Sequence, residues 1–146
     1  MSINAFMSEK HKECDHFFTS AENAVNESDW TLATQQYQAF HTSLESHLCM
    51  EEEVLFPEFE ASTGMTQGPT QVMRMEHVQM RSLCEKLSSA LDQKNKDSYL
   101  ANADTLMILM QQHNMKEEQM LYPMADRVLN NAEVVIKSMQ NNHCVV

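Results

Sequence analysis

The sequence is poor in the residues that interrupt helices. Its 146 residues include only two glycines and three prolines. Methionine is abundant, with 13 residues, and the helix-favouring residues alanine, leucine, glutamine and glutamate are plentiful. This composition argues against a sheet architecture and predicts an all-helical protein. At this length, we expect a single domain, 1–146, that buries about two-thirds of the surface of the unfolded chain.

Basic residues are also scarce. Lysine and arginine together number 10 against 21 acidic residues, which gives a formal net charge of -11. Nucleic acids and anionic membranes repel such a surface, so neither is expected as a partner. No stretch approaches the roughly 18 apolar residues of a membrane-spanning helix. The first residues also lack the charged and apolar regions of a secretory signal, so a cytoplasmic location is expected.

The four cysteines show no spacing typical of a metal site or a redox motif. They are Cys14, Cys49, Cys84 and Cys144. In a chain without a recognisable export signal, unpatterned cysteines are expected to be reduced thiols that pack as small apolar side chains.

The most informative feature is an internal repeat at an offset of 66 residues. Each copy is a histidine, then 35 residues, then His-x-x-x-Glu-Glu-x-x-Leu-(Phe/Tyr)-Pro, and the register needs no gap. Two helical hairpins that each present two histidines and a glutamate are a direct way to build a two-metal site. The repeat aligns His11 with His77, His47 with His113, Glu51 with Glu117, Glu52 with Glu118, Leu55 with Leu121, Phe56 with Tyr122 and Pro57 with Pro123.

Apolar residues follow a helical 4-3-4-3 spacing in four segments, which begin near Met7, Phe40, Met73 and Leu106. Short connections make successive helices antiparallel. We therefore predict an all-α, up-down-up-down antiparallel four-helix bundle. It consists of two pseudo-repeated hairpins, about 3–62 and 69–130, followed by a short extra C-terminal helix. Two prolines are expected to kink or end the second and fourth helices, namely Pro57 and Pro123.

The repeated histidines and glutamates lie on the apolar stripes, where a heptad pattern would place leucine. His47 and Glu51 are four residues apart and therefore stack on one helix face, as do His113 and Glu117. A surface ion pair is the ordinary explanation of a single such motif, but a carboxylate on a core stripe must be paired or metal-bound. The predicted metal ligands are His11, His47, Glu51, His77, His113 and Glu117.

Six nitrogen and oxygen ligands are too many for one tetrahedral zinc, while magnesium and calcium prefer sites made of oxygen alone. Mixed ligation inside a four-helix bundle suits two irons or two manganeses. If both glutamates bridge, each metal receives two histidine nitrogens and two glutamate oxygens. An oxo or hydroxo bridge then leaves one position open for a small ligand.

On these motifs, the chain resembles the hemerythrin-like (HHE) cation-binding domain family over essentially its whole length. The resemblance implies a four-helix bundle with a non-haem di-iron centre. It also implies proteins that bind or sense dioxygen, handle nitric oxide, repair iron–sulfur clusters or sense iron. Oxygen-carrying hemerythrins usually have H-x-x-x-H on the third helix and H-x-x-x-x-D on the fourth. This chain has His77-x-x-x-Arg81 and His113-x-x-x-Glu117 instead, and so resembles the four-His, two-Glu subgroup that includes di-iron repair proteins.

We therefore predict a non-haem di-iron protein, with two Fe ions, that binds dioxygen or a related diatomic for sensing, storage or delivery. The expected partner is a small diatomic or anionic ligand such as dioxygen, nitric oxide or peroxide. One alternative is a di-iron oxidoreductase or repair protein that acts on nitric oxide or peroxide, or donates iron to damaged iron–sulfur clusters. Another is an iron store. The sequence reveals no separate substrate pocket or catalytic acid, which favours a binding protein over an enzyme.

His16 competes with His11 as the ligand from the first helix. The repeat favours His11, because it aligns with His77 whereas His16 aligns with Ser82. At about 100° per residue the two side chains point some 140° apart, so one helix cannot aim both at one site. The other two histidines, His41 and His143, are expected to be solvated.

Several polar residues near the motifs have simpler explanations. Glu52, Glu53 and Glu118 fall off the apolar stripes and are expected to be solvated. Tyr122 aligns with Phe56, so packing alone is expected to explain it. For Arg81 two interpretations stand: it controls access to the open metal position, or it extends to solvent and pairs with Glu85.

Overall fold

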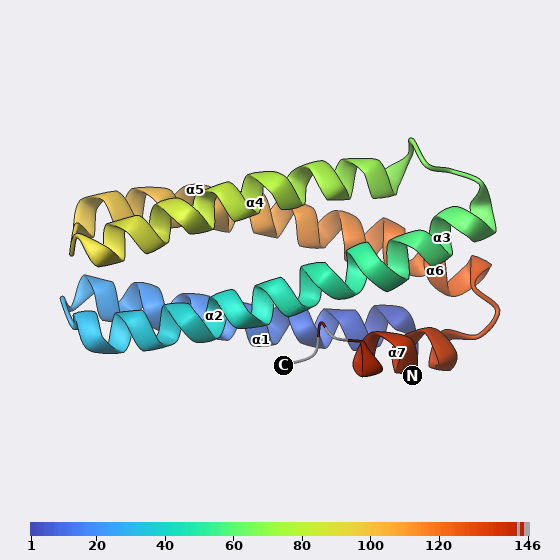
Figure 1. Ribbon diagram of the computed structural model, residues 1–146, viewed down its shortest axis with the longest axis horizontal. Coiled ribbons are helices and arrows are strands. Elements are labelled where there is room, and N and C mark those ends of the chain that lie inside the picture. Colours follow the sequence, from blue (N-terminus) through green and yellow to red (C-terminus); the bar gives the residue numbers. More distant parts are fainter. Residues whose placement is uncertain (143, 145–146) are drawn as a thin grey trace.

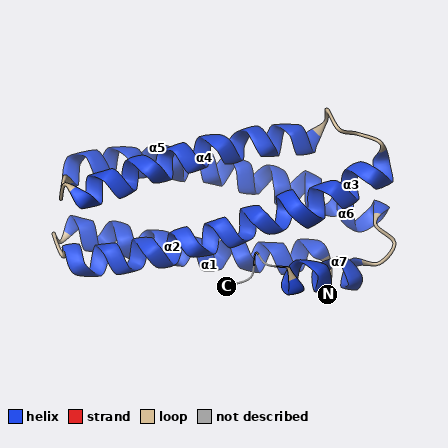
Figure 2. Ribbon diagram, in the orientation of Figure 1, coloured by secondary structure: helices blue, strands red, loops and turns tan. Residues whose placement is uncertain are grey.

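The computed structural model describes residues 1–142 and 144, and this part of the chain is helical with no strand (Figures 1 and 2). Helix α1 packs along α2, and α4 packs along α5, so that the two hairpins lie one above the other in Figure 1. The prediction of an all-α, antiparallel four-helix bundle is confirmed. The four long helices are α1 (Ile3–Asn26), α2 (Trp30–Met50), α4 (Pro69–Asp92) and α5 (Lys96–Lys116).

Local sequence signals set where the helices begin and end. The side chains of Ser2, Asp29 and Asn95 each accept a hydrogen bond from the backbone N–H three residues later, at the starts of α1, α2 and α5. Pro69 opens α4, where its missing N–H costs nothing. Gly64 follows the end of α3 (Phe56–Thr63) in a left-handed conformation, with φ of 72°.

The prolines were predicted to kink or end the second and fourth helices, but neither Pro57 nor Pro123 ends the helical path that begins with α2 and α5. Each passes into a π-helical turn, η1 (Glu51–Leu55) and η2 (Glu117–Leu121), and then continues as α3 (Phe56–Thr63) and α6 (Tyr122–Val128). In each turn the backbone N–H five residues on bonds to the glutamate carbonyl. Pro57 and Pro123 then fall in the first turn of the next helix, a position that proline tolerates.

The π turns affect which residues face the core. A π turn holds one more residue than an α turn, and the 4-3-4-3 spacing fails after Glu117, whereas Val54, on the same stripe after Glu51, stays buried. Met120, which that spacing places on the core stripe, is 61% exposed. The next two residues, Leu121 and Tyr122, are buried instead.

The C-terminal segment folds back onto the bundle. Helix α7 (Ala132–Asn141) packs against α1 and η1 through Val135, Ile136 and Met139. Beyond it a disulfide joins Cys144 to Cys49, with 5.6 Å between the Cα atoms. The expectation of four reduced thiols is therefore wrong for this pair, which is 95 residues apart and has no local signal.

The other two cysteines, Cys14 and Cys84, are buried thiols. His143 lies outside the described residues. Within 1–142 and 144, no helix is both long and apolar enough to cross a membrane.

Two apolar clusters form the core, one toward each end of the bundle. The first includes Phe18, Phe40 and Leu87, near the α1–α2 and α4–α5 turns. The second includes Phe56 and Tyr122, near the π turns and α7. Between these clusters lies a layer of buried histidines and glutamates.

Candidate metal centre

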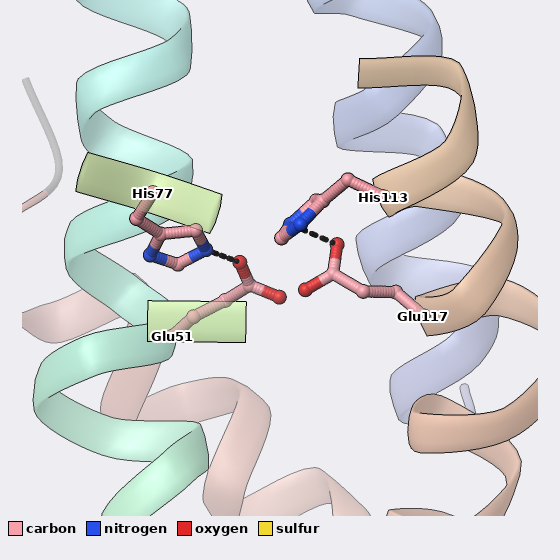
Figure 3. A group of neighbouring side chains, drawn as sticks. All are labelled: Glu51, His77, His113 and Glu117. Atoms are coloured by element: carbon pink, nitrogen blue, oxygen red, sulfur yellow. Dashed lines mark ion pairs between the residues drawn. The ribbon is translucent and has the colours of Figure 1, made fainter. Parts of the chain in front are cut away.

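The structure brings all six predicted ligands together in this buried layer. They come from six different segments, and none is more than 4% exposed. Figure 3 shows four of them, with the histidine rings and the carboxylates converging between the helices. The six are His11 on α1, His47 on α2, Glu51 at the start of η1, His77 on α4, His113 on α5 and Glu117 at the start of η2.

Their ligand atoms form two groups that share Glu117. Oε1 of Glu117 lies 3.1 Å from Nε2 of His11 and 3.3 Å from Nε2 of His113. One carboxylate therefore contacts a histidine of each hairpin. Within each group the ligand atoms lie within 4.8 Å of one another: Glu51, His77, His113 and Glu117 in one, and His11, His47 and Glu117 in the other.

Glu51 also lies between the hairpins. Its Oε1 is 3.2 Å from Nε2 of His77 and 3.5 Å from Nε2 of His47. These contacts are poorly directed: among the residues that the structure describes, none forms a well-aligned hydrogen bond with the buried Oε1 of Glu51, Nε2 of His77, Nε2 of His113 or Oε2 of Glu117. Buried polar atoms are nearly always satisfied. Four such atoms aimed at one another around common points are therefore suited to metal ions.

The outward-facing nitrogens of three histidines bind carboxylates. Nδ1 lies 2.6 Å from Glu118 in His11 and 2.6 Å from Glu52 in His77. The expectation that Glu52 and Glu118 are merely solvated is wrong, although the side chain of Glu118 is 39% exposed. A carboxylate behind the imidazole fixes its tautomer and is typical of metal-bound histidine.

The third carboxylate was not predicted from the sequence. Nδ1 of His113 lies 2.8 Å from Glu76, which in turn forms an ion pair with Lys116. The 66-residue repeat cannot reveal Glu76, because the equivalent residue in the first half is Lys10. The available signal was that Glu76 directly precedes His77. It therefore lies at the level of the predicted ligands, on a helix that packs along α5.

Arg81 holds one of these carboxylates in place. Its guanidinium donates to Glu52 at 2.8 and 3.0 Å, and to Glu45 at 3.1 Å. These hydrogen bonds go to Glu45 and Glu52 rather than to Glu85, so the predicted pair with Glu85 is wrong, whereas control of access to a metal position stays a prediction. Burial alone would raise the pKa of Glu52, but the hydrogen bonds from His77 and Arg81 outweigh it and lower the pKa to about 2.

Tyr122 reaches the ligands, which the sequence did not predict. Its hydroxyl donates to Oε2 of Glu51 at 2.7 Å and lies 2.9 Å from Oε1 of Glu117. It also lies 3.2 Å from Nε2 of His11 and 3.3 Å from Nε2 of His47. The hydroxyl thus sits among the ligand atoms of the His11 group, whereas the equivalent Phe56 stacks on His77.

With no metal bound, the cluster holds protons at neutral pH. Burial alone would lower the pKa of His11 and His77, but their carboxylate partners outweigh it and raise each pKa to about 9. Burial and the neighbouring Glu117 raise the pKa of Glu51 to about 8. The pKa of Glu117 is lowered because His113 and other proton donors outweigh its burial. The site is therefore one whose protons a metal ion would displace.

The family model for the hemerythrin HHE cation binding domain matches residues 2–125. The chain belongs to this family. No curated protein and no solved structure matches the chain significantly. As a hemerythrin-family protein it is a metal-binding helical bundle, and the buried histidine and glutamate cluster is where the family's cation site is expected.

Two further histidines of this hemerythrin-family chain, His16 and His41, lie away from the cluster. His16 is exposed, and its ring lies edge-on to the ring of Phe17. His41 is partly exposed and stacks on Tyr37. The structure therefore places His11, rather than His16, beside the other predicted ligands.

His47 differs from the other three clustered histidines. Among the residues that the structure describes, none forms a hydrogen bond with its buried Nδ1. Burial, the largest effect, lowers the pKa of His47 to about 4, although Glu117 partly offsets it. This histidine is therefore neutral at physiological pH and available as a ligand.

Proposed function

We propose that this hemerythrin-family protein holds a non-haem di-iron centre, with an oxo or hydroxo bridge, and binds dioxygen or a related diatomic for sensing, storage or delivery. The observation that carries the proposal is the buried cluster of six nitrogen and oxygen ligands with their inner atoms convergent. His77 and His113 would hold one iron, and His11 and His47 the other. Glu51 and Glu117 would lie between the two irons.

The donor set fits iron better than the common alternatives. Four imidazoles and two carboxylates exceed the needs of one tetrahedral zinc, and all-oxygen sites are preferred by magnesium and calcium. A pair of irons supplies the binding of a small diatomic ligand. The protein's own contribution is to keep the ligands desolvated between two apolar clusters and to fix the histidine rings through their carboxylates.

The space beside the ligands supports a very small guest. A cavity of about 10 Å³ adjoins His11, His47 and His113, which is close to the room that one water molecule needs. Its other walls are mainly apolar, with Leu44 and Met80 among them. A space of this size and character favours a diatomic over an organic substrate.

Elemental analysis of protein produced in iron-replete cells tests the metal centre. We expect close to two irons per chain, because two groups of ligand atoms share one carboxylate. A stoichiometry of one, or zinc alone after anaerobic reconstitution with iron, would contradict the proposal.

Absorption spectroscopy of the iron-loaded protein tests the guest. A charge-transfer band that appears with dioxygen or nitric oxide and disappears when the gas is removed supports a binding role. Irreversible bleaching with accumulation of product would instead support the di-iron oxidoreductase. Two irons that respond to none of dioxygen, nitric oxide and peroxide would leave an iron store.

A further inference from the structure

Among the residues that the structure describes, a further group of metal-ligating side chains lies outside the histidine and glutamate cluster. It consists of Cys49, Glu53 and Cys144, whose sulfur and carboxylate oxygen atoms all lie within 4.8 Å of one another. The two sulfurs are joined in the disulfide that ties the C-terminal segment to α2. Reduction of this disulfide therefore leaves two thiols and a carboxylate at one place.

Cys49 and Glu53 lie on the outer side of the helical path that carries two of the cluster ligands. They follow His47 and Glu51 by two residues each, which places them about half a turn around the helix from those ligands. Glu53 is exposed and Cys49 is partly exposed. Glu53 also lines a groove of about 570 Å³ between η1, α3 and α7. A cation can therefore reach this group from solvent without entering the buried cluster.

Packing of α7 holds Cys144 beside Cys49 independently of the disulfide. Met139 of α7 is fully buried and Ile136 is nearly so, both within the apolar cluster near the π turns. The backbone N–H of Cys144 donates to Oδ1 of Asn142 at 3.2 Å, which orders the chain just after the helix. Because these contacts do not involve the sulfur–sulfur bond, we expect the reduced protein to keep the three side chains together.

The internal repeat has no counterpart of this group. The residues that the repeat aligns with Cys49 and Glu53 are Met115 and Gln119, and both are exposed. The cysteine and the glutamate therefore do not follow from the repeated metal motif. They occur in the hairpin against which the C-terminal segment packs, where Cys144 completes the group.

We propose that, once its disulfide is reduced, this group binds a zinc ion through the thiolates of Cys49 and Cys144 and the carboxylate of Glu53. Thiolate ligands select zinc over magnesium and calcium. The ligand atoms of a tetrahedral zinc lie within about 3.8 Å of one another, so only a small adjustment of the group is needed. Water fills the fourth position. The site is separate from the proposed di-iron centre and does not depend on it.

The reaction that opens the site is a thiol–disulfide exchange. One small thiol attacks a sulfur of the disulfide and forms a mixed disulfide, and a second small thiol releases it. The protein gains two electrons and two protons as two thiol groups, while the two small thiols leave joined as their own disulfide. Zinc then displaces the two thiol protons. A coordinate link thus replaces the covalent one between the C-terminal segment and α2.

Titration with Co²⁺ tests the proposal, because cobalt bound by thiolates has an intense near-ultraviolet charge-transfer band that nitrogen and oxygen ligands do not give. The full-length, iron-loaded protein is reduced without oxygen by a phosphine, which becomes a phosphine oxide and competes little for the metal. Reduced wild type is expected to bind one cobalt with this band, and Zn²⁺ should displace it. The oxidised protein is expected to show no such band.

Variants identify the ligands. Cys49→Ser should remove the site, whereas Cys84→Ala, which removes a buried thiol elsewhere, should leave the band unchanged. Glu53→Gln keeps both sulfurs and should weaken cobalt binding by at least the roughly 10-fold that loss of a carboxylate behind a ligand costs. Glu58→Gln is its matched control, because Glu58 lines the same groove but does not belong to the group.

The outcomes separate this site from the di-iron centre, since iron is measured in the same samples. Reduced wild type with two irons but no thiolate band overturns the zinc site alone. A band of equal strength in Cys49→Ser or in the oxidised protein overturns it as well. So does equal binding by Glu53→Gln and Glu58→Gln, because the carboxylate would then not be a ligand. A thiolate band in reduced protein that takes up no iron supports the zinc site and contradicts the di-iron centre.

Discussion

The two hairpins carry the same candidate ligands at the same offset, but different neighbours orient these side chains in each hairpin. His113 in the second hairpin is backed by Glu76, and Lys116 holds that carboxylate in turn. His47 in the first hairpin has no such partner among the described residues, and Lys10 stands in the equivalent position. The ligands follow the internal repeat, whereas the groups that orient them do not.

For His11 and His77, the carboxylate that binds Nδ1 comes from the other hairpin. Glu118 from the second hairpin binds His11, and Glu52 from the first binds His77. Only Glu52 is further held by an arginine, Arg81. The second hairpin's histidines are therefore the better oriented pair, and we expect the two proposed iron positions to be unequal in affinity.

The largest effect is expected where the halves do not differ, at the shared carboxylates. Glu117→Ala removes a contact to His11 and His113 at once and should cost both metals, whereas His77→Ala should cost one. Loss of a metal present at 100 times its Kd removes about 2.7 kcal/mol of stabilisation. Thermal melts and iron analysis of the iron-treated variants measure this. A Glu117→Ala or Glu51→Ala protein that melts with wild type would refute the bridging role.

The next largest effect is expected at Glu76 and Lys10, the equivalent positions at which the two halves differ. Glu76→Ala should speed the loss of one iron to a chelator, because removing a carboxylate behind a ligand histidine weakens metal binding by about 10- to 100-fold. Lys10→Glu should slow the loss of the other iron, since it installs in the first half the carboxylate that the second half has. Stopped-flow chelation records both. If Lys10→Glu speeds release, the two halves are not comparable at this position.

A smaller effect is expected from the tyrosine that only the second half has. Tyr122→Phe removes a hydroxyl that donates to Glu51, while Phe56 supplies the equivalent ring without one. The metal-free protein should lose about 1–3 kcal/mol, because a buried carboxylate loses its donor. Urea unfolding with the metal removed measures this, and Tyr37→Phe, which also removes a buried hydroxyl's bond but far from the ligands, is the control. An unchanged metal release rate in Tyr122→Phe would confine its role to stability.

The smallest effect is expected in the number of protons that the cluster releases when metal binds. His11 and His77 each have a pKa raised to about 9, and Glu51 one raised to about 8. At neutral pH, metal binding should displace one proton from each, and affinity should rise with pH through this range. Conversely, the ion pairs of the two charged histidines stabilise the metal-free protein fully below about pH 6.5 and are lost as the pH rises through about 9. Calorimetry in buffers of different ionisation enthalpy counts the protons, and release of none would contradict these pKa values.

The fold and the clustering of the six candidate ligands could be predicted because both depend on spacing along one chain. Helical periodicity set the bundle, and the repeat set which histidines and glutamates share its core. Glu52 and Glu118 were misjudged because a residue off its own helix stripe can still reach a ring on a neighbouring helix, and that depends on how the helices are rotated against each other. Glu76 was not predicted because the residue that the repeat aligns with it is a lysine, Lys10.

The other failures also come from interactions that spacing does not encode. Met120 was placed in the core because the 4-3-4-3 spacing assumes an unbroken α-helix, and η2 adds a residue to one turn. The disulfide between Cys49 and Cys144 depends on α7 folding back across α1 and η1, a contact between distant parts of the chain.

The π turns have a mechanical consequence for the two kinds of ligand. Each of the four histidines lies on a regular α-helix, whereas Glu51 and Glu117 are the first residues of the widened turns η1 and η2. Regular helix is stiff along its axis, while a widened turn can open or tighten with little disturbance to the helix before it. The histidines therefore form a rigid frame, and the two carboxylates are its compliant members. When the charge of the metal ions proposed to bind in this cluster changes, we expect the two carboxylates to move and the four imidazoles to stay in place.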